Sequence, residues 1–253
     1  MNCFEDNAVN LDILRKRAFN GRWAEVGEGV VPLTAADPDF QVEPKVLQAM
    51  KDYLDGGYLS YTPKLGFPEF REAIAQGINA RKSEGVEPDL VLPLDSAARG
   101  MYVIAGAFLK PGDEMVIFDP VDFLFKESCL AAGGVPVLFP ARPRADGTGL
   151  ELGDLEDYIT PKTRMIGLCN PHNPWGTLYT REDLEHILDL ANRHNLWIMN
   201  DEIWSDIVYP EQPFLSINQV EGDKSRVISV YGFSKSFGGF AHRVRVLQRP
   251  GGL

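Results

Sequence analysis

A lysine that stands between two serines is the residue of this sequence best suited to covalent chemistry. Ser234, Lys235 and Ser236 follow a β-branched run at residues 227–230, and Arg243 comes eight residues after the lysine. A lysine at a strand end can lose its proton through desolvation and attack a carbonyl to form a Schiff base. An arginine beside it can bind an anion. The alternative is a surface loop with two ordinary cations, and this segment alone does not decide between the two.

Three other polar segments stand where predicted strands end or a predicted helix begins. They are residues 170–176 (Asn-Pro-His-Asn-Pro-Trp-Gly), residues 200–204 (Asn-Asp-Glu-Ile-Trp) and residues 95–101 (Asp-Ser-Ala-Ala-Arg-Gly-Met). Each has an ordinary structural interpretation, namely a proline turn, a helix N-cap and the small-residue start of a helix. The functional interpretation is that these segments present amide, carboxylate and helix N–H groups to one ligand.

Short apolar strands alternate with amphipathic helices from Leu90 onward. We expect strands at residues 114–118, 135–139, 164–169, 197–200 and 227–231, and helices at residues 97–109, 123–132, 152–159 and 181–195. Helices are also predicted at residues 11–19, at residues 44–54 and from Pro68 through Ile78. Continuously apolar strands separated by helices predict an α/β fold in three layers, with a mainly parallel sheet flanked by helices.

The composition is that of a globular protein, with 44% apolar and 24% charged residues. The net charge of −11 argues against a nucleic-acid-binding surface, because polyphosphate partners require a basic footprint. Three scattered cysteines make neither a disulfide framework nor a zinc site, which indicates a reducing compartment. The sequence has no signal peptide and no continuously apolar window of about 20 residues, so we expect a cytoplasmic protein without a membrane partner.

The carboxyl end of the sequence is unusual for a doubly wound sheet. Residues 244–247 (Val-Arg-Val-Leu) begin what could be another strand, and the chain then ends in Pro-Gly-Gly-Leu. A sheet of this kind rarely ends just after a loop that carries reactive residues. Missing sequence is therefore expected at this end.

The four segments, in their order along the chain, resemble those of the fold-type-I enzymes of pyridoxal 5′-phosphate (PLP). The resemblance is specifically to the class I/II aminotransferases and the cystathionine β-lyase-like C–S lyases. The resemblance covers about Val31 to Arg243, and family enzymes continue beyond this point into a C-terminal small domain. It implies an N-terminal arm with a substrate-side loop at residues 1–40 and a PLP-binding large domain at residues 41–253, without the small domain. Residues 36–40 are closest in form to the C–S lyase branch.

The resemblance implies a role for each segment. Lys235 would hold the PLP aldehyde and later move the Cα proton of the substrate, while Arg243 and Ser234 would bind the phosphate. Asn173 would present its amide to the ring hydroxyl of the cofactor. Asp201 would face the pyridine nitrogen and keep it protonated.

The resemblance also implies contacts with the cofactor from the start of a helix at residues 96–98 and from Trp204. The N–H groups of Ala97 and Ala98 would point at the phosphate, and Ser96 would add its hydroxyl. Trp204 occupies the position at which most family members have a tyrosine that tunes the cofactor. An indole donates a hydrogen bond but does not accept one, so Trp204 cannot copy that tyrosine's bond to the ring oxygen.

Two further aromatic residues correspond to family positions. The register of the ring-stacking aromatic falls on Asp122, which leaves the adjacent Phe123 as the candidate stacker. Tyr61 resembles the tyrosine that reaches across a homodimer to the phosphate of the partner. The alternative for Tyr61 is an aromatic residue packed within its own loop.

The resemblance implies a PLP-dependent aminotransferase that acts on an α-amino acid. A cystathionine β-lyase-like C–S β-lyase is the alternative, because both reactions begin with loss of the same Cα proton. A third interpretation is a truncated, catalytically inactive PLP-binding relic. The absent small domain normally supplies an arginine for the substrate carboxylate, so the 253-residue chain alone is expected to turn over poorly.

Overall fold

The computed structural model describes residue 5, residues 8–237 and the backbone of residues 243–247. The chain forms two compact units, which are residues 1–62 with 233–241 and residues 63–232 with 242–253. The larger unit carries the sheet, and the smaller unit carries the N-terminal helices and the segment with Lys235. The boundary at residue 40 between an arm and a PLP-binding domain stays a prediction.

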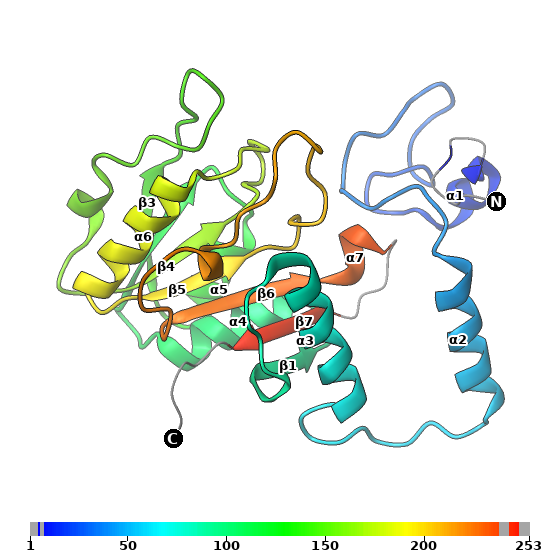
Figure 1. Ribbon diagram of the computed structural model, residues 1–253. Helices are drawn as coiled ribbons and strands as arrows, with labels where there is room; N and C mark the ends of the chain where they lie inside the picture. Colours follow the sequence, from blue (N-terminus) through cyan, green and yellow to red (C-terminus); the bar gives the residue numbers. More distant parts are fainter. Residues whose placement is uncertain (1–4, 6–7, 238–242, 248–253) are drawn as a thin grey trace. The chain divides into compact units, whose positions relative to one another are not determined.

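A seven-stranded sheet forms the centre of the larger unit (Figure 1). In the order in which they neighbour one another, its strands are β1 (Val91–Leu94), β7 (Arg243–Leu247), β6 (Val227–Gly232), β5 (Trp197–Asp201), β4 (Thr163–Cys169), β2 (Glu114–Asp119) and β3 (Val135–Pro140). The pairs from β3 through β6 are parallel, and β7 runs antiparallel to both β6 and β1. The mainly parallel sheet predicted from the sequence is confirmed.

Helices cover both faces of this sheet and make the predicted three layers. On one face, α4 (Ala97–Phe108) and α5 (Leu124–Ala131) belong to an apolar core that includes Met199 of β5. On the other face, α6 (Arg181–Arg193) contributes to a second core that includes Ile198. Because consecutive residues of a central strand face two helical layers, both must be apolar, which explains the lack of inside–outside alternation.

The structure corrects two sequence-based assignments. The helix expected at residues 152–159 is only a 3-10 turn, η3 (Leu155–Tyr158), in which Leu155 alone is buried. Leu152 is buried as well, but Gly153 follows it and disfavours the start of a helix there, so the segment makes a single 3-10 turn. The first strand, β1, was not predicted, because it has four residues and contains Pro93. Proline is tolerated there because β1 lies at the edge of the sheet.

The remaining elements are short turns and helices. In the larger unit, they are α3 (Pro68–Lys82), η2 (Pro88–Leu90) and η4 (Ile217–Gln219). In the smaller unit, they are α1 (Leu11–Arg17), α2 (Pro44–Asp55) and α7 (Phe233–Ser236). A search of the described residues finds no helix whose length and hydropathy would allow it to cross a bilayer.

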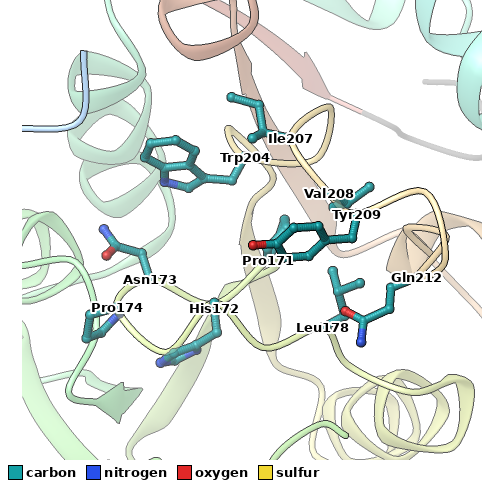
Figure 2. Close-up of a pocket in the computed structure, with 11 residues that line it drawn as sticks. Pro171, His172, Asn173, Pro174, Leu178, Trp204, Ile207, Val208, Tyr209 and Gln212 are labelled. Carbon is teal, nitrogen blue, oxygen red and sulfur yellow. The ribbon is translucent and has the colours of Figure 1, made fainter. Parts of the chain in front are cut away.

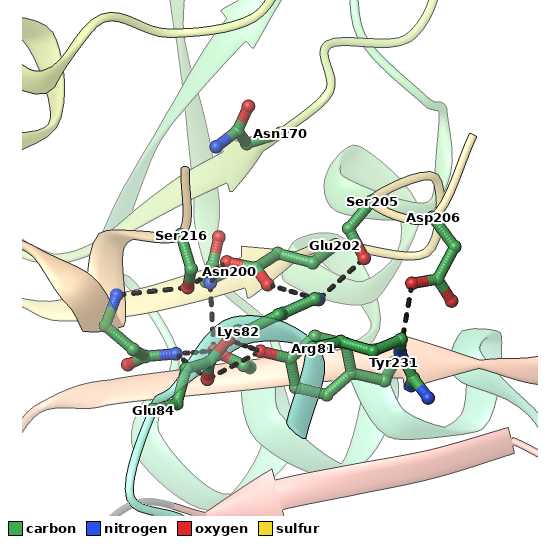
Figure 3. Close-up of polar contacts among 12 residues, drawn as sticks. Arg81, Lys82, Glu84, Asn170, Asn200, Glu202, Ser205, Asp206, Ser216 and Tyr231 are labelled. Atoms are coloured by element: carbon green, nitrogen blue, oxygen red, sulfur yellow. Dashed lines mark hydrogen bonds and ion pairs between the residues drawn. The ribbon is translucent and has the colours of Figure 1, made fainter. Parts of the chain in front are cut away.

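A buried polar network ties the end of α3 to β5, β6 and η4 (Figure 3). The Glu84 carboxylate accepts hydrogen bonds from the Tyr231 hydroxyl, at 2.7 and 2.8 Å, and from Nδ2 of Asn218, at 2.9 Å. Nearby, Nζ of Lys82 lies 3.1 Å from Oε2 of Glu202. One ammonium group therefore shares a buried site with two carboxyl groups. Burial, and next the charge of Glu202, raise the pKa of Glu84 from 4.5 to about 7.

Replacing Glu84 with glutamine should change how stability depends on pH. The native state keeps the Glu84 proton up to about pH 7, whereas the unfolded chain releases it near 4.5. Between these values the native state binds more protons, so the free energy of unfolding falls as the pH rises and stays lowered above the window. Glu84→Gln removes this contribution, and its stability should decline less across the window.

The measurement is urea unfolding at several pH values between about 5 and 8. Glu87→Gln is the matched control, because it removes the same charge from an exposed position in the adjacent loop. Identical pH dependence of the wild type and Glu84→Gln would contradict the raised pKa.

Candidate active site

The end of β5 directs two adjacent carboxylates to opposite faces of the sheet. Asp201 pairs with Cys169 of β4 in the parallel register, on the face that α4 and α5 cover. Glu202 points to the other face, where it meets Lys82. Asp201 is 6% exposed, and its Oδ1 accepts the N–H of Ile203 at 3.0 Å. The alternation predicted for these two acids is therefore present in the fold.

The Cys169 side chain keeps the surroundings of Asp201 apolar. Its thiol is buried and donates to the carbonyl oxygen of Pro171 at 3.4 Å. Burial, and next the charge of Asp201, hold the pKa of the Cys169 thiol well above its usual value. The thiol therefore stays protonated and is not a nucleophile. In such surroundings a carboxylate interacts strongly with a cation, because little water competes with it.

The start of α4 lies over the same face of the sheet as Asp201. Ala97 belongs to the apolar core that also contains Cys169 and Val230. Ser96 is the N-cap, and its Oγ accepts the N–H of Arg99 at 2.9 Å, which leaves its hydroxyl proton available for donation. The first N–H groups of a helix, here those of Ala97 and Ala98, have no acceptor within the helix. They form an N-terminal end that favours an anion.

The beginning of β7 reaches the same edge of the sheet. Arg243 pairs with Gly232, at the end of β6, and with Leu94, at the end of β1. Because β7 is antiparallel, its first residue lies beside the carboxyl ends of its two neighbours. The backbone of Arg243 is thus placed close in the sheet to the strand that leads into Ser96, while its side chain lies outside the described residues.

Asn173 and Trp204 line one pocket of about 430 Å³ at the ends of β4 and β5. Figure 2 shows their side chains on one side of this pocket and Tyr209 and Gln212 on the other. Nδ2 of Asn173 lies 3.4 Å from Oδ2 of Asp122, a long hydrogen bond. The Asn-Pro turn and the segment after β5, which the sequence placed in one site, therefore adjoin each other.

His172 is a positioning residue that the sequence analysis passed over. Its Nε2 lies 2.9 Å from the carbonyl oxygen of Pro120, and its Nδ1 lies 3.2 Å from the Tyr179 hydroxyl. A carbonyl can only accept, so Nε2 carries the proton and Nδ1 accepts from the tyrosine. Burial lowers the pKa of His172 and keeps the ring neutral. The ring links the turn after β2 to the turn after β4; its place between two Asn-Pro pairs was the signal for it.

Two predicted aromatic contacts lie at exposed positions. Phe123, just before α5, is 65% exposed, so much of its side-chain surface is accessible to a ligand. Tyr61, in the smaller unit, is fully exposed in the single chain and is not packed within its own loop. The roles of Phe123 in stacking and of Tyr61 across a dimer stay predictions.

Lys235 and Ser234 lie in the smaller unit, beside the predicted substrate-side loop. Nζ of Lys235 donates to the carbonyl oxygen of Ala36 at 3.0 Å. Arg22, which is 4% exposed, donates to the carbonyl oxygen of Ala35 at 2.7 Å, hydrogen-bonds the carbonyl oxygen of Asp37 and pairs with Asp39. The lysine thus contacts a loop that a buried arginine holds in place. Ser234 is 5% exposed, and its Oγ has no hydrogen-bond partner among the described residues.

The chain was compared with known proteins. The aminotransferase class I and II family matches residues 28–245. An aspartate aminotransferase of Sulfolobus acidocaldarius is 34% identical over 214 residues, which are 84% of this chain and 53% of that protein. The aromatic aminotransferase structure from Pyrococcus horikoshii has a TM-score of 0.80 and 32% identity, over 86% of this chain and 58% of that one.

A third comparison concerns the fold alone. Cystalysin from Treponema denticola, whose structure contains pyridoxal 5′-phosphate, has a TM-score of 0.83 at 23% identity and covers 93% of this chain and 62% of that one. The chain spans about half the length of the curated relatives it matches. The family match covers most of the chain in sequence and in fold, so the family predicted from the four segments is confirmed. The chain belongs to the class I and II aminotransferases, which are PLP enzymes.

Proposed function

We propose that this chain is the cofactor-binding part of a PLP-dependent aminotransferase that acts on an α-amino acid. The observation that carries the proposal is the grouping at one edge of the sheet of the buried Asp201 carboxylate, the start of α4 and the start of β7. A cation-binding group and an anion-binding helix end on the same face match the pyridine nitrogen and the phosphate of the cofactor. The aspartate and aromatic aminotransferases among its relatives support an amino-acid substrate.

The donor set of the chain fits the cofactor. The N–H groups of Ala97 and Ala98, which have no acceptor within α4, and the hydroxyl of Ser96 suit a phosphate, and Arg243 would add a guanidinium to them. The buried Ser234 Oγ, which has no partner among the described residues, is a further group that a ligand would satisfy.

The ring of the cofactor would be met by groups from three other segments. Asn173 and Trp204 would donate hydrogen bonds on the side of the ring hydroxyl. Phe123 would stack on the ring. These assignments rest on the pocket that Asn173 and Trp204 share and on the accessible surface of Phe123.

The reaction requires the residues of the chain to hold charges and move one proton. When bound, PLP withdraws electrons from the substrate Cα and acidifies its hydrogen. The Asp201 carboxylate would stabilise the protonated pyridine nitrogen. Lys235 would hold the cofactor and, as a free amine, would take the Cα proton of the substrate. Release of an oxo acid would identify an aminotransferase, whereas release of a thiol would identify the C–S lyase alternative.

The proposal also covers the compartment and the oligomeric state of the whole protein. We place it in the cytoplasm as a homodimer in which Tyr61 of one chain reaches the phosphate bound by the other. Support for the compartment comes from Cys129 and Cys169, which are buried free thiols. Support for the dimer comes from the full exposure of Tyr61 in the single chain.

Borohydride reduction in the presence of PLP should label Lys235, because a lysine–carbonyl adduct becomes permanent on reduction. Lys235→Ala should lose both the visible absorbance of the bound cofactor and the label. Lys224→Ala is the matched control, since Lys224 also donates to a backbone carbonyl, that of Val220. Peptide mass spectrometry locates the label, and a label on another lysine would disprove the assignment.

Asp201→Asn should retain PLP but slow the loss of the substrate Cα hydrogen. The expected loss is roughly 100-fold, or about 3 kcal/mol, because one preorganised charge contact is removed from a buried site. Exchange of the Cα hydrogen of aspartate and phenylalanine with deuterated solvent, followed by NMR, measures this step. Asp189→Asn, which changes an acid that is 62% exposed on α6, should leave the rate unchanged. Equal exchange rates for Asp201→Asn and the wild type would contradict the role.

Tyr61→Phe should weaken PLP binding by roughly tenfold or more, because a hydrogen bond to a charged phosphate is lost. Tyr58→Phe is the control, since Tyr58 is another exposed tyrosine of the same loop. PLP titration is combined with sedimentation analysis. A dimer that binds PLP equally well with Tyr61 or Phe at this position would remove the role across the dimer.

A further inference from the structure

The last turn of α3 holds the segment that follows β5 (Figure 3). Nζ of Lys82 lies 3.1 Å from Oε2 of Glu202 and 2.6 Å from Oγ of Ser205. Nε of Arg81 lies 3.4 Å from Oδ1 of Asp206. Two consecutive cations of one helix therefore bind three residues of one loop.

The Glu202 carboxylate is the centre of these contacts. Its side chain is fully buried and accepts from Nδ2 of Asn200 at 2.8 Å and from Oγ of Ser216 at 2.6 Å, in addition to Lys82. The Lys82 ammonium also lies 3.9 Å from the centre of the Tyr231 ring. A buried ion pair is weak evidence for stability, because desolvation offsets most of the attraction. What such a pair does well is to hold one geometry, since every alternative leaves a charge buried without its partner.

The loop that this pair holds also carries two residues of the candidate site. Asp201 immediately precedes Glu202, and Trp204 stands between Glu202 and Ser205, both of which contact Lys82. The N–H of Glu202 donates to the carbonyl oxygen of Val230 at 3.0 Å, which continues the pairing with β6. After Glu202 the loop has no regular secondary structure, and its backbone bonds are the turn contacts from Ser205 to Glu202 and from Ile207 to Trp204. Short turns open more readily than paired strands, so side-chain contacts to residues 202–206 add to what holds this loop.

We propose that Lys82 and Glu202 are positioning residues, whose buried ion pair on one face of the sheet fixes the direction of Asp201 and Trp204 toward the cofactor on the other. That the ion pair holds this loop is inferred from the contacts of residues 202–206. That the loop then affects the cofactor rests on the proposed function. Neither residue touches the cofactor. Each acts through the loop, because a shift of the Glu202 backbone moves the neighbouring Asp201 carboxylate with it.

The test compares two variants that each remove one ion pair. Lys82→Met with Glu202→Gln removes both charges together, since losing one partner would strand the other in the interior. Arg144→Met with Asp183→Asn is the matched control, because Asp183 is also buried and its pair with Arg144 stabilises the start of α6, away from the loop. Urea unfolding of both PLP-free proteins measures the general loss of stability.

Two readouts separate positioning from stability. Hydrogen exchange of residues 201–208, measured by mass spectrometry on the PLP-free proteins, reports on the loop alone. With PLP added, two further quantities report on the contact of Asp201 with the ring. One is the affinity of the protein for PLP, and the other is the pH at which the visible absorbance of bound PLP changes. The Lys82/Glu202 variant should exchange this segment at least about tenfold faster than the control, bind PLP roughly tenfold more weakly and shift the absorbance transition.

Exchange in residues 201–208 that rises no more than in the control would overturn the inference, whatever the activity. Faster exchange with an unchanged affinity and absorbance transition would also overturn it, because the loop would then be held without consequence for the cofactor. Failure of the wild type to be labelled by PLP at Lys235 counts instead against the proposed function, and the exchange comparison still decides whether the ion pair holds the loop.

Discussion

The parallel pairing of β4, β5 and β6 between two helical layers is the constraint on which the rest of the larger unit depends. Because successive residues of β5 face opposite layers, the strand ends with Asp201 on one face and Glu202 on the other. The register also places Asp201 level with Cys169 and Val230. A shift of one residue would exchange the two acids, so the apolar pattern of the strand determines which carboxylate lies on the face that α4 and α5 cover.

The two faces at this point differ in chemistry as well as in direction. Around Asp201, the surroundings are apolar, with a protonated thiol and the start of a helix. Around Glu202, one ammonium, two carboxyl groups and several amide and hydroxyl groups satisfy one another. The first arrangement holds one carboxylate in apolar surroundings, and the second joins several charged and polar groups in one network. Under the proposed function, the network around Glu202 would hold the segment that carries Asp201 without touching the cofactor.

In the smaller unit, too, the residues that hold the surroundings of Lys235 lie apart from the lysine in the sequence. Lys235 contacts the carbonyl oxygen of Ala36, and the loop around Ala36 is held by Arg22 through carbonyl groups and Asp39. The arginine is buried, so its contacts with the loop are little weakened by water. Because Arg22 also binds the carbonyl oxygens of Ala35 and Asp37, part of this hold does not depend on the side chains of the loop.

The sequence by itself determined the elements and the family. Apolar runs and helical spacing placed the central strands and most helices, because these patterns are local, and the polar segments at the strand ends identified the aminotransferase class. The choice of Asp201 over Glu202 also followed from strand alternation, although the chemical roles of both remain proposals.

Tertiary structure alone decided the contacts between residues far apart in the chain. The insertion of β7 between β1 and β6, the partners that set the His172 tautomer, and the ion pair between Lys82 and Glu202 each join separate segments. The predicted helix at residues 152–159 is only the 3-10 turn η3, although Leu152 and Leu155 are both buried in the core. Local periodicity describes which side of an element is apolar. It does not specify which distant group will lie against that side, since that choice is made by the packing of the whole fold.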